Sequence, residues 1–444
     1  MRYVTTRGQS PPTSLEWALF DGLAPDGSLY MPESIDRWSH EELGALPIRS
    51  LPELGIRALR PYTTPEISDA ALAELVTDAL NFQIPLVSVE PGVYALELFH
   101  GPTLAFKDIG ARVMARLISA LHDGGDPTSV LVATSGDTGS AVAHAFYRVP
   151  HTRVIILYPD GRVSPSQEAQ LTMFNGENEG KDRDAGASNV HAYAIAGSFD
   201  DCQRLVKAAS SDVALIERVR LTSANSINIG RLLPQMVYYF HALGQLKAAS
   251  GEERPVLSTP SGNFGNLTAG LMAKRAGLPI ERFVAATNVN DVVPAYLETG
   301  RFVPRKSVRT LANAMDVGNP SNFDRMLWLY QGHLDAMRRD VVGSRHLDDE
   351  VRTTIRRVYG DRGYLLDPHS AIAYLGLTQS ARSQSHQPGI FLATAHPAKF
   401  PEVVEPIVGR ALDRPAPLAD ALAQPRHIMR MEASLDAVKE RLLA

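Results

Sequence analysis

The chain has a single cysteine, Cys202, among its 444 residues, which excludes an internal disulfide framework and a zinc site built on thiolates. Its 13 histidines show no metal-ligand spacing, so we expect no metal ion in the functional site. No apolar run is long enough to cross a membrane, and none follows Met1 as it would in a secretory signal. Together these absences predict a cytoplasmic protein.

The charge balance also lacks the basic excess that attracts nucleic acids and anionic membranes. Lys and Arg together number 44, Asp and Glu number 49, and the formal net charge is −5. Domains that bind nucleic acid are usually strongly basic. We therefore expect neither a nucleic-acid nor a membrane partner.

Short β-rich runs alternate with helical runs from about residue 93 onward. Seven runs are assigned to strands: VYALELF (93–99), SVLVATS (129–135), RVIILYP (153–159), HAYAIA (191–196), VLSTP (256–260), FVAATNV (283–289) and GIFLATA (389–395). Because helical periodicity lies between most of them, the pattern predicts βαβ units and parallel sheets in an α/β fold. Ligands of such folds bind beyond the carboxyl ends of the strands, where loops lead into helices.

A chain of 444 residues is long enough for two or three domains. The predicted parts are a helical N-terminal unit at 1–92, a smaller α/β domain at 93–250, a larger α/β domain at 251–424 and a C-terminal helix at 425–444. The charged stretch 301–360 is expected to form a helical insertion in the larger domain. The polar, glycine-containing stretch 175–189 is expected to be an exposed loop.

Lys107 is the first candidate for chemistry. It follows the run VYALELF and the turn HGPT, and it opens a helix whose apolar stripe includes Ile109 and Val113. A lysine in the first helical turn faces the positive end of the helix dipole, and the apolar neighbour Phe106 also favours the neutral amine. A neutral, half-buried lysine is the nucleophile that a Schiff base requires. The structural alternative is a surface lysine paired with Asp108.

Two loops between a strand and a helix can hold anions. In SGDTGS (135–140), small residues let backbone N–H groups converge, and the Ser135 and Thr138 hydroxyls add donors. Asp137 is unusual in an anion-binding loop, and it either orients donors or faces a cationic group. In SGNFGN (261–266), the glycines permit close approach of a phosphate and two asparagines supply amide donors. Neither loop matches a dinucleotide or P-loop pattern, and each alone is also typical of a helix cap.

Two further segments carry candidate residues. NSINIGR (225–231) enters a helix and brings Asn225, Ser226 and Arg231 toward one anion, although an N-cap with a surface arginine explains the same letters. Thr394 ends the run GIFLATA, where a hydroxyl can bond a heterocycle nitrogen. The alternative for Thr394 is a buried threonine that is satisfied by the backbone.

The segments form an ordered set that covers most of the chain: TRG (6–8), GLAPDGSLYMP (22–32), LFHGPTLAFKDIGAR (98–112), ATSGDTGSA (133–141), FDDCQ (199–203), NSINIGR (225–231), STPSGNFGN (258–266), TLANAMDVGNPSNFDRM (310–326) and TAHPAKF (394–400). Taken in this order they resemble the threonine synthase family of the fold-type II pyridoxal-phosphate enzymes. The phrase GNPSNFDRM and the APDG segment favour threonine synthases over the related dehydratases and sulfhydrylases.

The resemblance implies a fold with two parallel-sheet α/β domains and a role for each matching residue. Lys107 corresponds to the lysine that forms a Schiff base with pyridoxal 5'-phosphate. Thr394 corresponds to the residue that bonds the pyridine nitrogen. The cofactor phosphate is expected at Gly262, Asn263, Phe264, Gly265 and Asn266. The substrate carboxylate and the cofactor ring are expected at Ser135, Asp137 and Thr138, and the substrate phosphate at Asn225, Ser226 and Arg231.

The resemblance also implies a reaction, the conversion of O-phospho-L-homoserine and water to L-threonine and phosphate by a carbon–oxygen lyase, the last step of threonine biosynthesis. Two phosphates and a carboxylate need three anion-binding loops, and the sequence offers three. One alternative is another fold-type II lyase, of the dehydratase or phospholyase type; a non-catalytic ligand-binding relative is the other. We expect a monomer or a homodimer.

Overall fold

Two sheets organise the computed structural model, which describes residues 1–134, 136–175, 188–251, 254–381 and 387–443. The six-stranded sheet has the spatial order β11 (Val341–Arg345), β10 (Arg282–Thr287), β9 (Val256–Pro260), β12 (Gly389–Ala393), β4 (Val93–Glu97) and β3 (Leu86–Glu90). Its neighbouring strands are parallel, except that β3 runs antiparallel to β4.

The second sheet has five strands, all parallel to their neighbours. Its spatial order is β13 (Met429–Met431), β7 (Val190–Ile195), β6 (Thr152–Pro159), β5 (Thr128–Ala133) and β8 (Leu221–Thr222). All seven strands expected from the sequence are present, and they divide between two parallel-stranded sheets. The predicted α/β fold class is therefore confirmed.

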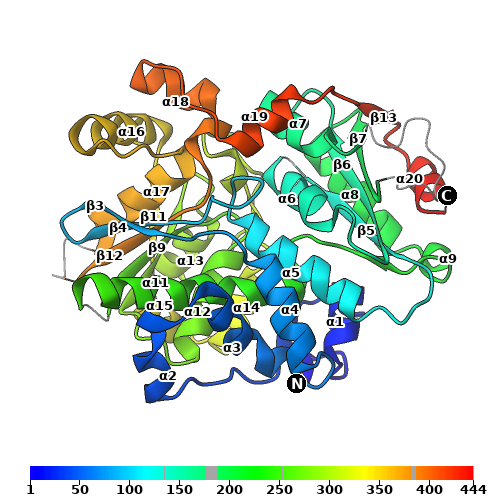
Figure 1. The fold of residues 1–444 in the computed structure, drawn as a ribbon, viewed down its shortest axis with the longest axis horizontal. Coiled ribbons are helices and arrows are strands. Elements are labelled where there is room, and N and C mark those ends of the chain that lie inside the picture. Colours follow the sequence, from blue (N-terminus) through cyan, green and yellow to red (C-terminus); the bar gives the residue numbers. More distant parts are fainter. Residues whose placement is uncertain (135, 176–187, 252–253, 382–386, 444) are drawn as a thin grey trace.

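Helices cover both sheets, and an N-terminal unit lies along the lower edge of the view in Figure 1. The N-terminal unit comprises β1 (Tyr3–Thr5), β2 (Tyr30–Pro32), α1 (Leu15–Asp21), α2 (His40–Gly44), α3 (Leu51–Thr63) and α4 (Asp69–Ala79). The five-stranded sheet is accompanied by α5 (Lys107–Ala120), α6 (Asp137–Phe146), α7 (Pro165–Thr172), α8 (Phe199–Ser210), α9 (Val213–Ile216) and α20 (Leu435–Leu443). The remaining helices are α10 (Ile229–Leu232), α11 (Met236–Ser250), α12 (Gly265–Arg275), α13 (Val292–Thr299), α14 (Phe323–Leu329), α15 (Leu334–Asp340), α16 (Asp348–Arg362), α17 (Pro368–Gly376), α18 (Pro401–Val408) and α19 (Ala416–Ala423).

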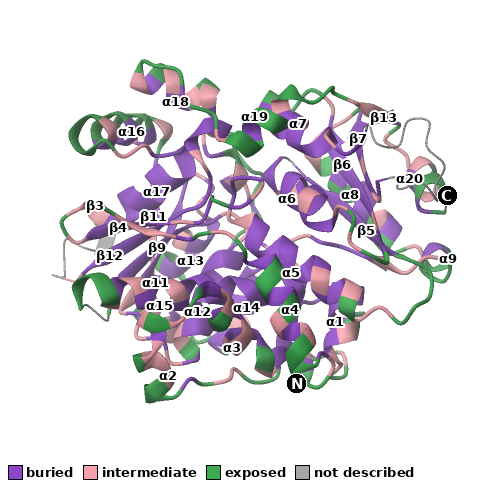
Figure 2. Cartoon of the chain, viewed as in Figure 1, coloured by how far each residue is buried: buried purple, intermediate pink, exposed green. Residues whose placement is uncertain are grey.

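The central strands of each sheet are buried on both faces, and Figure 2 shows them in purple. In β10, Phe283 and Ala285 join one apolar cluster with α11 and α12, whereas Val284 and Ala286 join another with α16 and α17. β5 alternates in the same way between a cluster with α5 and α6 and a cluster with α8 and α20. Because successive strand residues point to opposite faces and both faces are covered, these strands read as continuous apolar runs.

Three parts of the predicted organisation differ in detail from the structure. The stretch 301–360 includes α14, α15 and α16, but also β11, and no helix covers 301–310. The C-terminal part contains the short strand β13 before α20. β4, placed at the start of the smaller domain, pairs with β12 in the six-stranded sheet, although the division into domains itself stays a prediction. Positions 176–187 of the expected polar loop lie outside the described residues.

The order of the elements brings three helix starts toward one region. α5 follows β4, α12 follows β9 and α6 follows β5, so that the N-terminus of each helix lies beyond the carboxyl end of a parallel strand. This is where ligands of α/β folds bind. Within the described residues, no helix combines the length and the apolar character needed to span a bilayer.

Candidate active site

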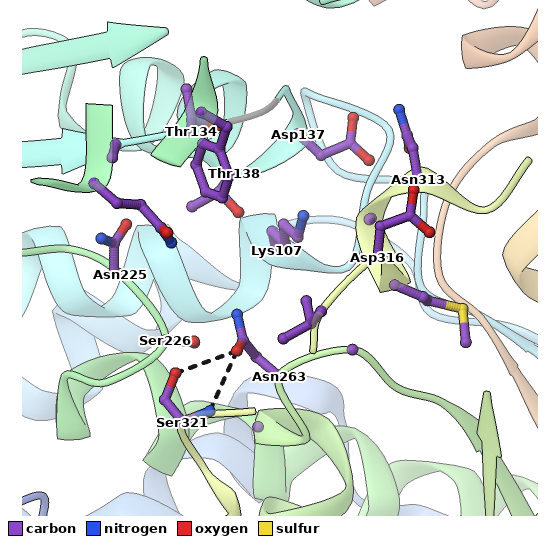
Figure 3. A pocket seen from close by; sticks show the side chains of 18 of the residues that line it. Lys107, Thr134, Asp137, Thr138, Asn225, Ser226, Asn263, Asn313, Asp316 and Ser321 are labelled. Atoms are coloured by element: carbon purple, nitrogen blue, oxygen red, sulfur yellow. Dashed lines mark hydrogen bonds between the residues drawn. The ribbon is translucent and has the colours of Figure 1, made fainter. Parts of the chain in front are cut away.

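Lys107 and Thr394 lie together at the centre of the site. The Phe106 backbone N–H donates to the Thr394 carbonyl oxygen at 2.9 Å, and Ala105 forms a bridge with Ala395. These bonds tie the turn before α5 to the carboxyl end of β12. Both Lys107 and Thr394 line a cavity of about 2770 Å³, and Figure 3 shows Lys107 in the middle of it.

The Lys107 amine has no hydrogen-bond or ion-pair partner in the described part of the chain. Asp108, its sequence neighbour, instead accepts bonds from the Thr103 backbone N–H at 2.9 Å and from the Thr103 hydroxyl at 2.6 Å. The alternative of a surface lysine paired with Asp108 is therefore excluded. Burial lowers the pKa of Lys107 to about 8; nearby Asp137 opposes this shift and two other cations support it. The amine is thus prepared for nucleophilic attack near neutral pH.

The loop from Gly262 to Asn266 presents the N-terminus of α12 to the same cavity. Phe264 is the N-cap in the left-handed region, with φ of 60°, and its side chain makes no capping bond. In the first turn, Asn266 Oδ1 accepts only the Leu267 N–H, at 2.8 Å. The backbone N–H groups of Gly265 and Asn266 therefore have no acceptor among the described residues. At Gly262 a Cβ atom would lie 2.8 Å from the Ala314 carbonyl oxygen, so only glycine fits this close approach. These open donors suit a phosphate.

The two asparagines of this loop have different surroundings. Asn263 Oδ1 accepts a hydrogen bond from the Ser321 hydroxyl at 3.2 Å, and Figure 3 shows the Asn263 amide nitrogen on the side of Lys107. The Asn266 side chain donates to the Pro260 carbonyl oxygen at 2.8 Å and accepts from the Ser261 hydroxyl at 2.8 Å. The expectation of two amide donors is thus corrected, because the Asn266 amide serves the loop itself.

The 135–140 loop differs from its predicted geometry. Ser135 lies outside the described residues. The backbone N–H groups of Gly136 and Gly139 both donate to the Thr134 hydroxyl, at 3.0 and 2.9 Å, so they do not converge on a ligand as we expected. Thr138 lines the cavity, and its contact with the substrate stays a prediction. The N–H groups of both glycines are therefore bonded within the loop itself.

Asp137 faces a cation, which decides between its two expected roles. Its Oδ1 atom lies 2.9 Å from Lys399 Nζ and accepts a hydrogen bond from Gln167 Nε2 at 3.2 Å. Burial alone would raise the pKa of Asp137, but Lys399 and Lys107 hold it below its usual range. Lys399 was not among the predicted site residues. The only signal for it is its place in TAHPAKF, shortly after the end of a strand.

The segment NSINIGR lines the cavity through Asn225, Ser226 and Arg231. Arg231 is only 5% exposed, so a surface arginine is excluded. Its Nη1 donates to the Ala224 carbonyl oxygen at 2.5 Å, and its Nε is buried without a partner among the described residues. Burial lowers the pKa of Arg231 to about 10, which leaves it cationic at neutral pH. A buried cation with a free donor suits an anionic ligand.

Arg325 is a second buried arginine that the sequence did not single out. It is 0% exposed and donates to four oxygens: those of the Tyr30, Ser226 and Ile227 carbonyls, at 3.1, 3.2 and 2.6 Å, and Asn322 Oδ1, at 2.7 Å. These bonds join GNPSNFDRM to the NSINIGR segment and to β2. Arg325 therefore fixes the loop that presents Asn225 and Ser226.

Comparison with known families gives three matches that together span nearly the whole chain. Residues 80–394 match the model "Pyridoxal-phosphate dependent enzyme". Residues 2–80 match "Threonine synthase N terminus", and residues 370–441 match "Threonine synthase, C-terminal". The chain belongs to the threonine synthase family.

Individual members of the family are similar over 90% or more of their length. The threonine synthase of Escherichia coli (strain K12) is 40% identical over 444 residues, which cover 100% of this chain and 99% of that protein. The Haemophilus influenzae threonine synthase is 46% identical over 402 residues, or 90% of each chain. The crystal structure of a PLP-bound threonine synthase from Brucella melitensis superposes with a TM-score of 0.91, at 38% identity, and covers 100% of this chain and 99% of that one.

Pyridoxal phosphate is the cofactor of this threonine synthase family member, and the cavity fits the group. An amine without a partner, a helix N-terminus with open N–H groups and the Thr394 hydroxyl all border one space. Within the described residues no hydrogen bond engages that hydroxyl, so it is free for a ring nitrogen. An aldehyde, a phosphate and a pyridine nitrogen need these three kinds of group.

Lys107→Ala should abolish the visible absorbance that the purified protein shows with its cofactor, because it removes the amine that is predicted to bind the cofactor covalently. The measurement is an absorbance spectrum of each protein after incubation with pyridoxal phosphate and gel filtration. An unchanged spectrum in the variant would refute the assignment of Lys107.

Arg325→Met should lower the free energy of unfolding by about 3 kcal/mol, because four buried oxygens lose their donor. Urea unfolding of the apoprotein measures this loss, with Arg339→Met on the exposed side of α15 as the control. Wild-type stability in Arg325→Met would show that the NSINIGR loop does not depend on this arginine.

Proposed function

We propose that this chain is a threonine synthase that converts O-phospho-L-homoserine and water to L-threonine and phosphate. The observation that carries the proposal is that the partnerless Lys107 amine and the buried cation Arg231 line the same cavity. A phosphorylated amino acid has an amine that can exchange with a lysine and a phosphate that needs a cation. The distance between Lys107 and Arg231 along the cavity then selects a substrate by the separation of its amine and its phosphate.

The residue roles form part of the same proposal. Lys107 binds the cofactor aldehyde, and Thr394 contacts the pyridine nitrogen. The loop of Gly262, Asn263, Phe264, Gly265 and Asn266 holds the cofactor phosphate. Ser135 and Thr138 receive the substrate carboxylate beside Asp137, and the substrate phosphate meets Asn225, Ser226 and Arg231.

Lys107 moves protons in the proposed reaction. When bound, pyridoxal phosphate supplies an electron sink conjugated with the substrate amine. The freed Lys107 amine takes the proton from Cα and exchanges protons between Cα and Cβ, as a general base and then an acid. Its pKa of about 8 suits both directions of transfer near neutral pH.

Arg231 acts at the other end of the substrate. The phosphate leaves from Cγ, and the charge that develops on it is stabilised by the buried guanidinium and the neighbouring side chains of Asn225 and Ser226. A proton is then added at Cγ, and water adds at Cβ to give the threonine hydroxyl. One water molecule is consumed and one phosphate is released, so the reaction balances.

The Thr394 hydroxyl sets the strength of the electron sink. A neutral hydroxyl does not stabilise a proton on the ring nitrogen as a carboxylate would. The moderated sink disfavours side reactions such as transamination.

The proposal extends to the setting of the enzyme. We propose that it acts in the cytoplasm in the last step of threonine biosynthesis, as a monomer or homodimer with no nucleic-acid partner. We also propose the division into 1–92, 93–250, 251–424 and 425–444. β4, from the 93–250 part, pairs with β12 of the 251–424 part, and β13, from the C-terminal part, pairs with β7 of the 93–250 part. These pairings connect the parts, which suits a site that lies between them.

Purified enzyme with pyridoxal phosphate should release phosphate from O-phospho-L-homoserine and form threonine in equal amounts. A coupled phosphate assay with chromatography of the amino-acid product measures both. Release of ammonia and an oxo-acid instead would identify a dehydratase-like lyase. Binding without turnover would indicate a non-catalytic relative.

Arg231→Ala should raise the KM for this substrate at least about tenfold, because a charge-assisted hydrogen bond to phosphate contributes about 1.5–3 kcal/mol. Steady-state titration of the variant measures the change, and Arg231→Lys should fall between the two proteins because it keeps the charge without the planar fork. A wild-type KM in Arg231→Ala would remove this residue from the substrate site.

A further inference from the structure

A second lysine lies buried beside Lys107. Lys399 ends the 3₁₀ turn η7 (Pro397–Lys399), and none of its side chain is exposed. Its ammonium lies 2.9 Å from Asp137 Oδ1 and donates to the Thr103 carbonyl oxygen at 2.7 Å. Lys399 thereby joins the start of α6 to the turn that precedes Lys107.

The Asp137 carboxylate is held in place from more than one direction. Gln167 on α7 donates from Nε2 to the same Oδ1 atom at 3.2 Å. Asp137 is also the first residue of α6, where the positive end of the helix dipole favours an anion. The carboxylate is therefore ionised and is bound by groups other than Lys107.

Three nearby charges act on the pKa of Lys107: Asp137 raises it, and Arg231 and Lys399 lower it. Figure 3 shows Lys107 and Asp137 bordering the same space, yet the ion pair of Asp137 is made with Lys399. A carboxylate that paired with Lys107 would stabilise the ammonium form, which has no lone pair to attack an aldehyde. Lys399 opposes that pairing because it occupies the carboxylate and because its own charge repels a second ammonium.

We propose that Lys399 is a positioning residue that keeps the Asp137 carboxylate from pairing with Lys107 and thereby keeps Lys107 neutral and reactive. The proposal rests on the proposed role of Lys107 as the cofactor-binding amine, but it does not depend on the identity of the substrate. Lys399 acts through Asp137 and through its own charge.

The test is the rate at which the apoenzyme captures pyridoxal phosphate between about pH 6 and pH 10, followed by absorbance and by borohydride trapping of the Lys107 peptide. Only the neutral amine reacts, so the midpoint of the rate profile reports the pKa of Lys107. Lys399→Met should raise that midpoint by at least about one pH unit, which lowers the rate at pH 7 about tenfold.

Three companion variants separate charge competition from a purely structural role. Asp137→Asn should move the midpoint in the opposite direction, because it removes the carboxylate whose charge favours the ammonium form of Lys107. Asp137→Asn combined with Lys399→Met should reverse the upward shift of Lys399→Met. Lys399→Arg keeps the charge and should keep a midpoint close to that of the wild type.

Lys274→Met is the matched control. Lys274 Nζ lies 2.8 Å from Asp340 Oδ1 and donates to the Glu281 carbonyl oxygen at 3.0 Å, the same two kinds of contact, but it does not line the cavity. Its removal should leave the capture midpoint unchanged. Melting temperatures of all the apoproteins report the structural cost of each change.

A wild-type midpoint in Lys399→Met, with only a lower melting temperature, would overturn the proposal. A double variant whose midpoint stays as high as that of Lys399→Met would overturn it as well. If Lys399→Met does not fold, Asp137→Asn decides, and an unchanged or raised midpoint contradicts the proposal. Failure of the phosphate-release assay leaves this result intact, because capture of the cofactor requires no substrate.

Discussion

An amine attacks an aldehyde only when it carries no proton, and Lys107 meets this requirement through burial without an anionic partner. An ordinary lysine, with a pKa of about 10.4, is almost fully protonated at pH 7. With its pKa at about 8, roughly one Lys107 amine in ten is neutral there. The nearby carboxylates must then be bound by groups other than Lys107, because pairing with one of them would stabilise its ammonium form. Asp108 is bound by Thr103, and Asp137 is bound by Lys399 and Gln167.

A few backbone contacts place Lys107 and the other groups that line the cavity. The bond from Phe106 to the Thr394 carbonyl sets the first turn of α5 against the end of β12, while α12 brings its open N-terminus from the neighbouring strand β9. Arg231 and Arg325 bond carbonyl or amide oxygens in place of carboxylates, so their positive charges are not neutralised by the described residues. Of the two, Arg231 lines the cavity, where an unneutralised cation favours an anionic ligand.

Much of the fold and of the cavity lining could be predicted from the sequence, for different physical reasons. Central parallel strands such as β6 and β10 are apolar on both faces and therefore stand out as runs. The strands β8 and β13, of two and three residues, carry no periodic signal and were missed. Lys107, Thr394 and Arg231 stood at strand or helix ends, where local reasoning applies. Lys399 and Arg325 gain their meaning only from contacts with segments distant in the chain, which no local pattern encodes.

The same distinction explains the two corrections within the loops. Glycine at 136 and 139 predicts a tight turn correctly, but the sequence does not show that the Thr134 hydroxyl accepts both N–H groups.

The charge state of Lys107 is the central claim, and competitive acylation of the lysines of the apoenzyme measures it directly when the extent of acylation of each lysine peptide is followed across pH. The account predicts half-maximal reactivity of Lys107 near a pH of about 8. A midpoint near the ordinary lysine value of about 10.4 would contradict it.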